Sequence, residues 1–425
     1  MTPPPDDTLE ARFAARMGQL LGPDFPKAIG VAVSGGGDSM ALLALAHGWA
    51  RDWGVSLLVA TVDHGLRAAS AAEAAMVARE CAALGHPHAT LNWTWDGTGN
   101  LQDAARRARL DLIGAWRGAV DHVLFGHTLD DLAETFLMRL ARGSGVEGLS
   151  AMDDKRQVPE GFWQVRPLLG ETRADLRHYA DILKLPYVDD PSNDDLRFDR
   201  VKARVALGSL APLGLTRRTL VETAGRMSRA GVALRARAAD VAARIMAPSP
   251  AATGHILFVR DGFAGVERDT QLRLLAGALQ YVSAAPYRPR AAPLEALLDR
   301  VLGGAGGTLH GAQIRVEREN FRIFREYQAV RDLMTPSGAA YPWDRAWRLS
   351  GPAIDGLSVR ALGPDGWAQI TERKEKILPY DSALSLPAVF EGARLVACRA
   401  LDFGPVHTVS HLYPPSGFIA FVQTR

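Results

Sequence analysis

Short apolar runs and longer helix-like segments alternate along the first half of the chain. The pairs of run and segment are residues 28–33 with 39–53, 55–62 with 68–84, and 122–125 with 129–141. This alternation is typical of parallel strands joined by crossover helices. The pattern therefore predicts a doubly wound α/β fold with a parallel sheet. Ligands of such sheets bind beyond the carboxyl ends of the strands, so we expect the chemistry directly after each apolar run.

The pattern changes after about residue 190, and the second half predicts different structures. Residues 216–245 are rich in Ala and Arg and predict one long linker helix. Up to about residue 330 the chain combines an Ala/Leu-rich helix, a glycine turn and alternating strand patterns, which fits a small α+β middle domain. From about Met334 it is richer in Pro, Gly and Trp, which predicts a β-rich C-terminal module. We expect three domains, 1–210, 211–332 and 333–425, because 425 residues exceed one ordinary core.

Composition narrows the class of protein. Hydrophobic residues make up 47% of the chain and charged residues 23%, as in soluble globular proteins. The longest apolar runs are far shorter than the roughly 20 residues of a transmembrane helix, and the N-terminus is proline-rich and acidic, unlike a secretory leader. We therefore expect a cytoplasmic protein without a membrane span. Cys81 and Cys398 are far apart, which argues against a disulfide framework, a cysteine zinc site or an iron–sulfur cluster.

Positive charge is concentrated in one segment, although the formal net charge is only +2. Between Arg197 and Arg237 there are ten Lys and Arg residues, among them Arg200 and Arg204, against two acidic residues. Such a segment suits a phosphate backbone. A solvated linker helix explains the same pattern equally well.

A glycine-rich loop follows the first apolar run and precedes a helical segment. Its residues are Ser34, Gly35, Gly36, Gly37, Asp38 and Ser39. Three glycines let backbone N–H groups approach an anion, and the start of the helix adds N–H donors without a partner. The expected ligand is therefore a phosphate group. The serines add hydroxyl donors, and Asp38 is placed to hold Mg²⁺. The structural alternative is a glycine turn with a serine cap. A Walker A motif is excluded, because no Gly-Lys-Ser/Thr follows the loop.

A second glycine pattern, residues 143–148, matches the spacing of a dinucleotide fingerprint. It follows a helix instead of a strand, so a nicotinamide site is not expected there. We interpret it as a flexible active-site loop.

Two further candidates follow the second apolar run. Asp63 and His64 come at its carboxyl end, beside the glycine loop, although such a pair is more often a turn. Arg106 and Arg109 lie one turn apart on a predicted helix, and two guanidiniums on one face suit a polyphosphate or an RNA backbone. Pairing of these arginines with Asp103 or Asp111 is the structural alternative.

The third apolar run is followed by a histidine and three acidic residues. His127, Asp131 and Glu134 are spaced four and three apart, so they share one face of a helix; Asp130 adjoins them. The histidine can stabilise charge on a phosphate, and the carboxylates can bind Mg²⁺ or an ammonium group. A polar helix start with acidic residues near its positive end is the alternative.

Taken in order, these segments resemble the tRNA(Ile)-lysidine synthase family of PP-loop enzymes. The resemblance covers roughly residues 27 to 205. It is carried by residues 34–39, 63–66, 100–106, 126–135, 142–149, 166–169 and 190–193. In this chain the last of these reads Asp190, Pro191, Ser192 and Asn193.

The resemblance implies a PP-loop fold of the adenine nucleotide α-hydrolase type and formation of lysidine at the wobble cytidine of an isoleucine tRNA with a CAU anticodon. ATP, Mg²⁺ and L-lysine would be consumed or bound, and AMP and pyrophosphate released. Residues 1–210 would be the ATP-binding catalytic domain, 211–332 the middle domain that binds substrate tRNA, and 333–425 a further tRNA contact. A homodimer is compatible with the family.

The resemblance also implies roles for individual residues. Asp38 would hold Mg²⁺ and pyrophosphate, His127 and Arg106 would steady the α-phosphate, and Asp131 would act as base or receive lysine. Asp63 and His64 would join the glycine loop in binding ATP. The substrate-binding residues would be Arg109, Asp130, Glu134, Arg142, Gly143, Ser144, Asn193, Arg200 and Arg204.

Two other classes of function remain open from the sequence. Another PP-loop enzyme could adenylate a different tRNA position or an amidation substrate with the same loop. A non-catalytic tRNA-binding protein would need the basic segment but not the loop aspartate. ATP-dependent formation of AMP separates an enzyme from a binding protein.

Overall fold

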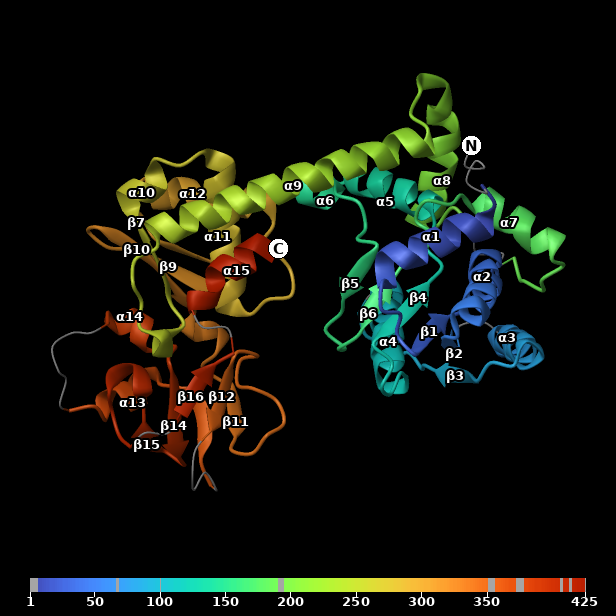
Figure 1. Ribbon diagram of the computed structural model, residues 1–425. Helices are drawn as coiled ribbons and strands as arrows, with labels where there is room; N and C mark the ends of the chain where they lie inside the picture. The colour runs from blue at the N-terminus through green and yellow to red at the C-terminus, as the bar shows by residue number, and fades with distance from the viewer. Residues whose placement is uncertain are drawn as a thin grey trace. The chain divides into compact units, whose positions relative to one another are not determined.

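The computed structural model describes residues 7–65, 69–99, 101–189, 195–350, 356–371, 378–405, 408–412 and 415–424. The chain divides into two compact units, Met1–Ala230 and Gly231–Arg425. Each unit is described by itself (Figure 1). The division into three domains with boundaries at 210 and 332 stays a prediction.

A six-stranded sheet forms the centre of the first unit. Its order is β3-β2-β1-β4-β6-β5, with β5 antiparallel to β6 and all other neighbours parallel. The strands are β1 Ala28–Ala32, β2 Ser56–Asp63, β3 His88–Asn92, β4 His122–Phe125, β5 Lys155–Gln157 and β6 Trp163–Val165. The predicted α/β fold with a mainly parallel sheet is confirmed. Because β1 lies between β2 and β4, the strand order reverses at β1, and this switch point is where open α/β sheets bind ligands.

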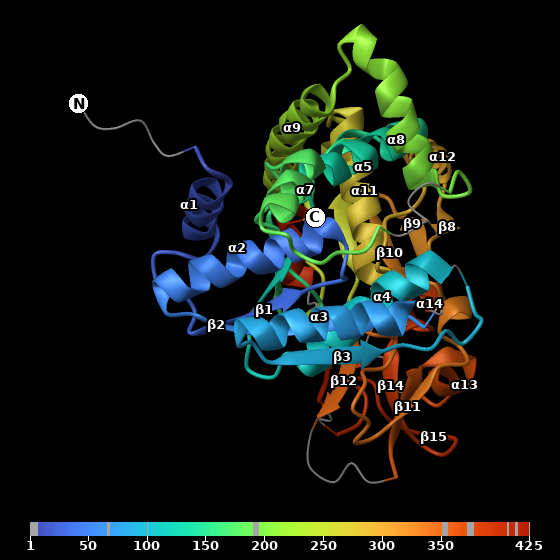
Figure 2. The same ribbon diagram turned by 90° about the vertical axis from the view of Figure 1, so that its right-hand side faces the viewer.

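Helices cover both faces of this sheet, as the alternation of apolar segments predicts. The helices of the first part of the chain are α1 Leu9–Leu21, α2 Gly37–Trp53, α3 Ser70–Leu84, α4 Leu101–Trp116, α5 Leu129–Ala141, α6 Val146–Leu149, α7 Arg173–Ile182, α8 Asp199–Leu210 and α9 Arg217–Ile245. Figure 2 shows α3 running alongside β3, which it contacts. The long helix predicted at 216–245 is therefore present as α9.

Two buried clusters hold the three layers together. On one face Ile29 and Val59 pack with residues of α1, α2 and α3. On the other face Val123 and Phe125 of β4 pack with Ile113 of α4. Successive strand residues point to opposite faces, so strands buried on both sides need the near-continuous apolar runs seen in the sequence.

The second unit contains antiparallel sheets. One has the order β7-β10-β9-β8, another β11-β13-β14-β15, and β12 pairs with β16. Its strands are β7 Ile256–Val259, β8 Gly307–Leu309, β9 Ala312–Val316, β10 Asn320–Arg325, β11 Met334–Pro336, β12 Trp347–Ser350, β13 Ser358–Ala361, β14 Pro387–Glu391, β15 Arg394–Ala397 and β16 Thr408–His411. Its helices are α10 Arg260–Ala264, α11 Arg268–Ser283, α12 Ala291–Leu302, α13 Gly363–Ala368, α14 Tyr380–Ala383 and α15 Phe418–Thr424.

Across the described ranges, no helix combines the length and apolarity needed to cross a membrane.

Candidate active site

The glycine loop joins the end of β1 to the start of α2 and is closed by its two serines. The Ser34 N–H donates to Ser39 Oγ at 3.1 Å, and Ser39 Oγ donates to the Gly36 carbonyl at 2.9 Å. Gly35 has φ of 87°, a left-handed conformation that favours glycine. No side chain caps the start of α2. The first N–H groups of this helix can therefore serve an anion, at the positive end of the helix dipole.

Gly126 lets the end of β4 approach this loop closely. A Cβ atom at Gly126 would lie 3.3 Å from the Asp38 carbonyl oxygen and 3.3 Å from Ser39 Cα, both backbone atoms. Such distances are too short for a side chain unless one segment moves. The absence of a side chain at residue 126 therefore sets the distance between the glycine loop and the histidine that follows.

A cavity of about 830 Å³ opens at this end of the sheet. Residues from the glycine loop, the ends of β2 and β4, and helices α4, α5 and α7 to α9 surround it. Its charged and polar lining is Ser34, Asp38, Ser39, His64, Glu73, Arg109, His127, Asp130, Asp131, Arg173, Arg177, Asp189, Arg200, Arg204 and Arg217. Gly36, Gly37, Ile113 and Phe125 also contribute to the wall. The cavity has both the donors of a phosphate site and apolar surface beside them.

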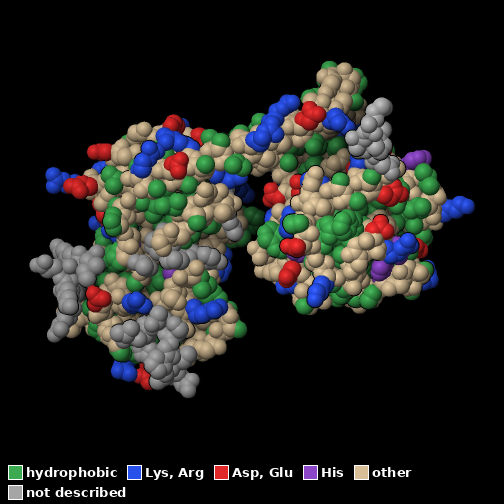
Figure 3. All heavy atoms as spheres, viewed as in Figure 1, with side chains coloured by type: hydrophobic (Ala, Val, Ile, Leu, Met, Phe, Trp, Pro, Cys, Tyr) green, Lys and Arg blue, Asp and Glu red, His purple; other side chains and the backbone are tan. Residues whose placement is uncertain are grey.

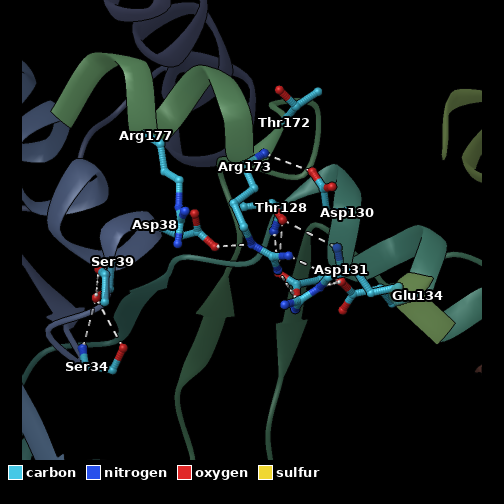
Figure 4. A network of polar contacts seen from close by, with 12 residues as sticks. Ser34, Asp38, Ser39, Thr128, Asp130, Asp131, Glu134, Thr172, Arg173 and Arg177 are labelled. Carbon is cyan, nitrogen blue, oxygen red and sulfur yellow. Dashed lines mark hydrogen bonds and ion pairs between the residues drawn. The ribbon is translucent and has the colours of Figure 1, made fainter. Parts of the chain in front are cut away.

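Arg173 connects the glycine loop to the acidic residues of α5 (Figure 4). Its Nε donates to Asp38 Oδ2 at 3.1 Å and its Nη1 to Glu134 Oε1 at 3.2 Å, while Nη2 lies 3.5 Å from Asp131 Oδ1. The Arg173 backbone N–H also donates to Asp130 Oδ2 at 2.8 Å. One residue thus contacts all four carboxylates.

The α5 carboxylates have additional partners that fix their positions. Asp131 Oδ2 accepts from the Thr128 backbone N–H at 2.9 Å, in a capping box that begins α5. Asp130 Oδ1 pairs with Arg217 at 2.7 Å. A helix start rich in acidic residues was the structural alternative for this segment, and the capping box shows that Asp131 has that role as well as its place in the cavity wall.

Glu134 is the most deeply buried of these carboxylates, with 1% of its side chain exposed. Its Oε1 accepts from Arg204 Nε at 2.9 Å, and its Oε2 lies 3.5 Å from Arg200 Nε. A buried carboxylate would be costly without such partners. An ammonium group bound here would have to share Glu134 with arginines that already surround it.

Asp38 has one oxygen that a metal ion could use. Burial raises the pKa of Asp38, and Arg173 opposes that rise. The second oxygen, Oδ1, is buried without a hydrogen-bond partner. In the part of the chain that the structure describes, no three His, Cys, Asp or Glu residues group as a metal site. The unpaired Oδ1 of Asp38 fits a Mg²⁺ ion that phosphate oxygens also hold, as is common in nucleotide sites.

Burial lowers the pKa of His127 to about 4, and Arg166, Arg109 and Arg200 lower it further against the opposing charge of Asp131. The imidazole is therefore neutral at pH 7 and can donate one N–H to an anionic oxygen. His64 also lines the cavity, with its pKa lowered by burial and by Arg109.

Several predicted residues lie away from the cavity lining. Arg109 lines the cavity, but Arg106 is exposed and is absent from the described lining residues. Asp63 accepts from the Gly65 N–H at 2.8 Å in the turn after β2. Asn193 and its neighbours 190–192 lie outside the described residues.

The active-site loop expected at residues 143–148 contains the turn that follows α5 and the first residues of α6. Gly143 has φ of 69°, and the Ser144 N–H donates to the Arg139 carbonyl at 3.1 Å, a contact that closes the last turn of α5. Arg142 is exposed and lies 3.4 Å from Asp199. These three predicted substrate residues are absent from the described lining of the cavity.

Arg173 and Arg177 line the cavity and were not predicted from the sequence, whereas Arg217, which also lines it, belongs to the basic segment predicted to face phosphates. Arg173 is the first residue of α7, where a positive charge opposes the helix dipole. That placement is a signal in the sequence, since the helix dipole disfavours a positive charge there unless negative charge lies nearby. Nothing in the sequence says which carboxylates supply that charge.

The fold and this cavity define a class of protein, the PP-loop enzymes that use ATP. A sequence model described as a PP-loop domain matches residues 9–210. A tRNA(Ile)-lysidine synthase from Ruegeria pomeroyi is 43% identical over 92% of this chain and 90% of its own length. One from Wolbachia pipientis wMel is 35% identical over 78% of each chain. The chain belongs to the tRNA(Ile)-lysidine synthase family.

A solved structure is also similar, but less so. A U34-tRNA thiolase from Methanococcus maripaludis covers 51% of this chain and 78% of its own length, at 18% identity and a TM-score of 0.44. That likeness says nothing about the reaction.

Substitution of Gly126 by alanine tests the close approach of β4 and the glycine loop. The added methyl group would meet backbone atoms at 3.3 Å, so the loop must shift. We expect ATP affinity to fall by about 10-fold or more, because a small misplacement of binding groups is costly, with the melting temperature little changed. Calorimetric titration with a non-cleavable ATP analogue measures this, and wild-type affinity would contradict it.

Substitution of Asp38 by asparagine tests the metal role. Asparagine keeps the size of the side chain but removes the charge that Mg²⁺ needs. We expect AMP formation to fall by about 100-fold or more, in a protein with an unchanged circular dichroism spectrum. Activity near that of the wild type would refute the metal role of Asp38.

The lowered pKa of His127 predicts how the site responds to pH. Because burial disfavours the charged imidazole, His127 stays neutral as pH falls from 8 to 5 and gains its proton only near pH 4. NMR titration of the histidine ring signals, assigned with a His127→Gln variant, measures this directly. A His127 signal that titrates near the ordinary pKa of about 6.5 would contradict the burial argument.

Proposed function

We propose that this chain ligates L-lysine to C2 of the wobble cytidine of a tRNA(Ile) with a CAU anticodon, at the expense of ATP. The observation that supports the proposal best is the cavity that holds a PP-loop, the unpaired Asp38 oxygen and a neutral histidine together. Membership of the lysidine synthase family supplies the substrate class.

In the first step the C2 oxygen of cytidine attacks the α-phosphorus of ATP. A new O–P bond forms, the bond to the β-phosphate oxygen breaks, and pyrophosphate leaves. We assign the glycine-loop N–H groups, Ser34 and Ser39 to the leaving pyrophosphate, which takes up negative charge as the bond breaks. The neutral His127 and the Arg109 guanidinium are assigned to the α-phosphate oxygens. Mg²⁺ held by Asp38 would supply further charge neutralisation to the phosphates.

In the second step the lysine ε-amine attacks the activated C2. A C–N bond forms, the C2–O bond breaks, and AMP leaves with that oxygen. The attacking amine must be neutral, so it loses a proton to a nearby base or to water. We assign Asp131 and Glu134 to the lysine, either holding its α-ammonium group or accepting the proton, in competition with their arginine partners.

Exposed arginines of α8 and α9 are proposed to face the tRNA backbone. Arg197, which precedes α8, and Arg218 and Arg229 of α9 are exposed, and Figure 3 shows blue side chains along α9. Phosphate contacts of this kind give affinity without reading sequence. How the anticodon is read is a separate property.

Cytoplasmic location and a homodimer remain part of the proposal. A dimer would show twice the 45.8 kDa mass of the chain.

Incorporation of labelled lysine tests the proposed function. We expect ATP-dependent labelling of unmodified tRNA(Ile) with a CAU anticodon, and none of the methionine tRNA with the same anticodon. Release of AMP in equal amount should accompany labelling, because one ATP is cleaved for each lysine joined. AMP formation on another substrate without lysine labelling would retain the PP-loop chemistry and reject lysidine synthesis.

A further inference from the structure

Two carboxylates on opposite sides of Arg173 each keep one oxygen without a hydrogen bond. Asp38 accepts from Arg173 at Oδ2, and its Oδ1 has no hydrogen-bond partner. Glu134 accepts from Arg173 at Oε1; its Oε2 has no hydrogen bond but lies 3.5 Å from Arg200 Nε. Both of these oxygens are buried. A buried carboxylate oxygen without a hydrogen bond is costly, and a ligand that completes the site is one explanation for it.

Arg173 has the geometry to set both carboxylates at once. The planar guanidinium projects its N–H groups in fixed directions, with Nε toward Asp38 and Nη1 toward Glu134 (Figure 4). Its side chain is 21% exposed, so the contacts are only partly screened by water. Within the described chain, Arg173 is the one cation within ion-pair distance of Asp38.

The other carboxylates are less dependent on this residue. Asp131 is also held by Thr128, and Glu134 by Arg204. Asp130 contacts the Arg173 backbone N–H, so this contact survives any change of the side chain. The start of α7 therefore stays attached to α5 when the guanidinium is replaced.

We propose that Arg173 is a positioning residue that orients Asp38 and Glu134 toward the two cationic ligands of the reaction. Asp38 Oδ1 is directed at Mg²⁺, and Glu134 Oε2 at an ammonium group of the amino-acid substrate, which shares this oxygen with Arg200. The second half of this inference rests on the proposed function; the first half needs only ATP and Mg²⁺. Because one guanidinium fixes both, a single substitution disturbs both ligand sites.

Binding of a non-cleavable ATP analogue at increasing Mg²⁺ concentration tests the first half without tRNA or lysine. In the wild type the affinity for the analogue rises with Mg²⁺. In Arg173→Met the Mg²⁺ concentration for half of this effect should rise by about 10- to 100-fold, the usual cost of losing the group that orients a metal-binding carboxylate. Melting temperatures establish that each variant is folded.

Arg173→Lys separates positioning from charge. Lysine keeps the positive charge, but one ammonium group cannot reproduce the directions of the guanidinium N–H groups. We expect Arg173→Lys to need nearly as much Mg²⁺ as Arg173→Met. Wild-type Mg²⁺ dependence in Arg173→Lys would show that charge alone acts and would overturn the inference, as would wild-type behaviour of both variants. If Arg173→Met fails to fold, the lysine variant still decides the question.

Arg177→Met is the matched control. Arg177 lies one turn later on α7, lines the same cavity and pairs with Asp189 instead of the acidic cluster. Its loss removes the same charge, so the analogue should bind more weakly at every Mg²⁺ concentration, without the shift in Mg²⁺ dependence. An equal shift in Arg177→Met would attribute the effect to cavity charge and overturn the inference.

Calorimetric titration with L-lysine tests the second half. We expect lysine affinity to fall by about 10-fold or more in Arg173→Lys, because Glu134 is no longer held in the same orientation. Unchanged lysine affinity would overturn this half. Failure of lysine labelling in the wild type would reject the proposed function while the Mg²⁺ result stands. Successful labelling with unchanged Mg²⁺ dependence would reject only the role of Arg173.

Discussion

The electrostatic balance around Arg173 is the interaction on which the candidate site depends. Asp38, Asp131 and Glu134 share one guanidinium, and Arg200, Arg204 and Arg217 neutralise the remaining charge of the α5 carboxylates. A buried carboxylate without a partner would be protonated or exposed to solvent. Ion pairs with the arginines therefore stabilise several carboxylates at the carboxyl end of the sheet, close to the glycine loop.

The parallel sheet explains why these groups meet. β1 and β4 are neighbours in the sheet although about ninety residues of sequence separate them, and their carboxyl ends lie at the same edge. The glycine loop leaves β1, and Gly126 and His127 leave β4. The missing side chain at Gly126 allows the two segments to pack backbone to backbone. Strand order thus brings the carboxylates and the N–H groups of the glycine loop together.

Most of the fold and of the phosphate site could be predicted from the sequence because their signals are local. The order of apolar run, glycine loop and helix is present in consecutive residues. The cavity is lined by many of the predicted residues, namely Ser34, Gly36, Gly37, Asp38, Ser39, His64, Arg109, His127, Asp130 and Asp131, whereas Glu134 is absent from its described lining. Arg106 and residues 142–144 were chosen by the same local reasoning, yet they lie off the cavity lining in the described structure. Residue spacing predicts which side chains share one face of a helix, but it does not predict which other parts of the protein that face contacts.

The sequence by itself determined the class of fold, the phosphate loop and the family, because each can be recognised from short segments of consecutive residues and their order along the chain. Only the tertiary structure decided the partners of the carboxylates. Arg173 lies 135 positions from Asp38 and 39 from Glu134, and no periodic pattern connects residues so far apart. Likewise, the neutral state of His127 follows from burial and from neighbouring arginines contributed by different elements. Ionisation and ion pairing depend on distance in space, which only folding sets.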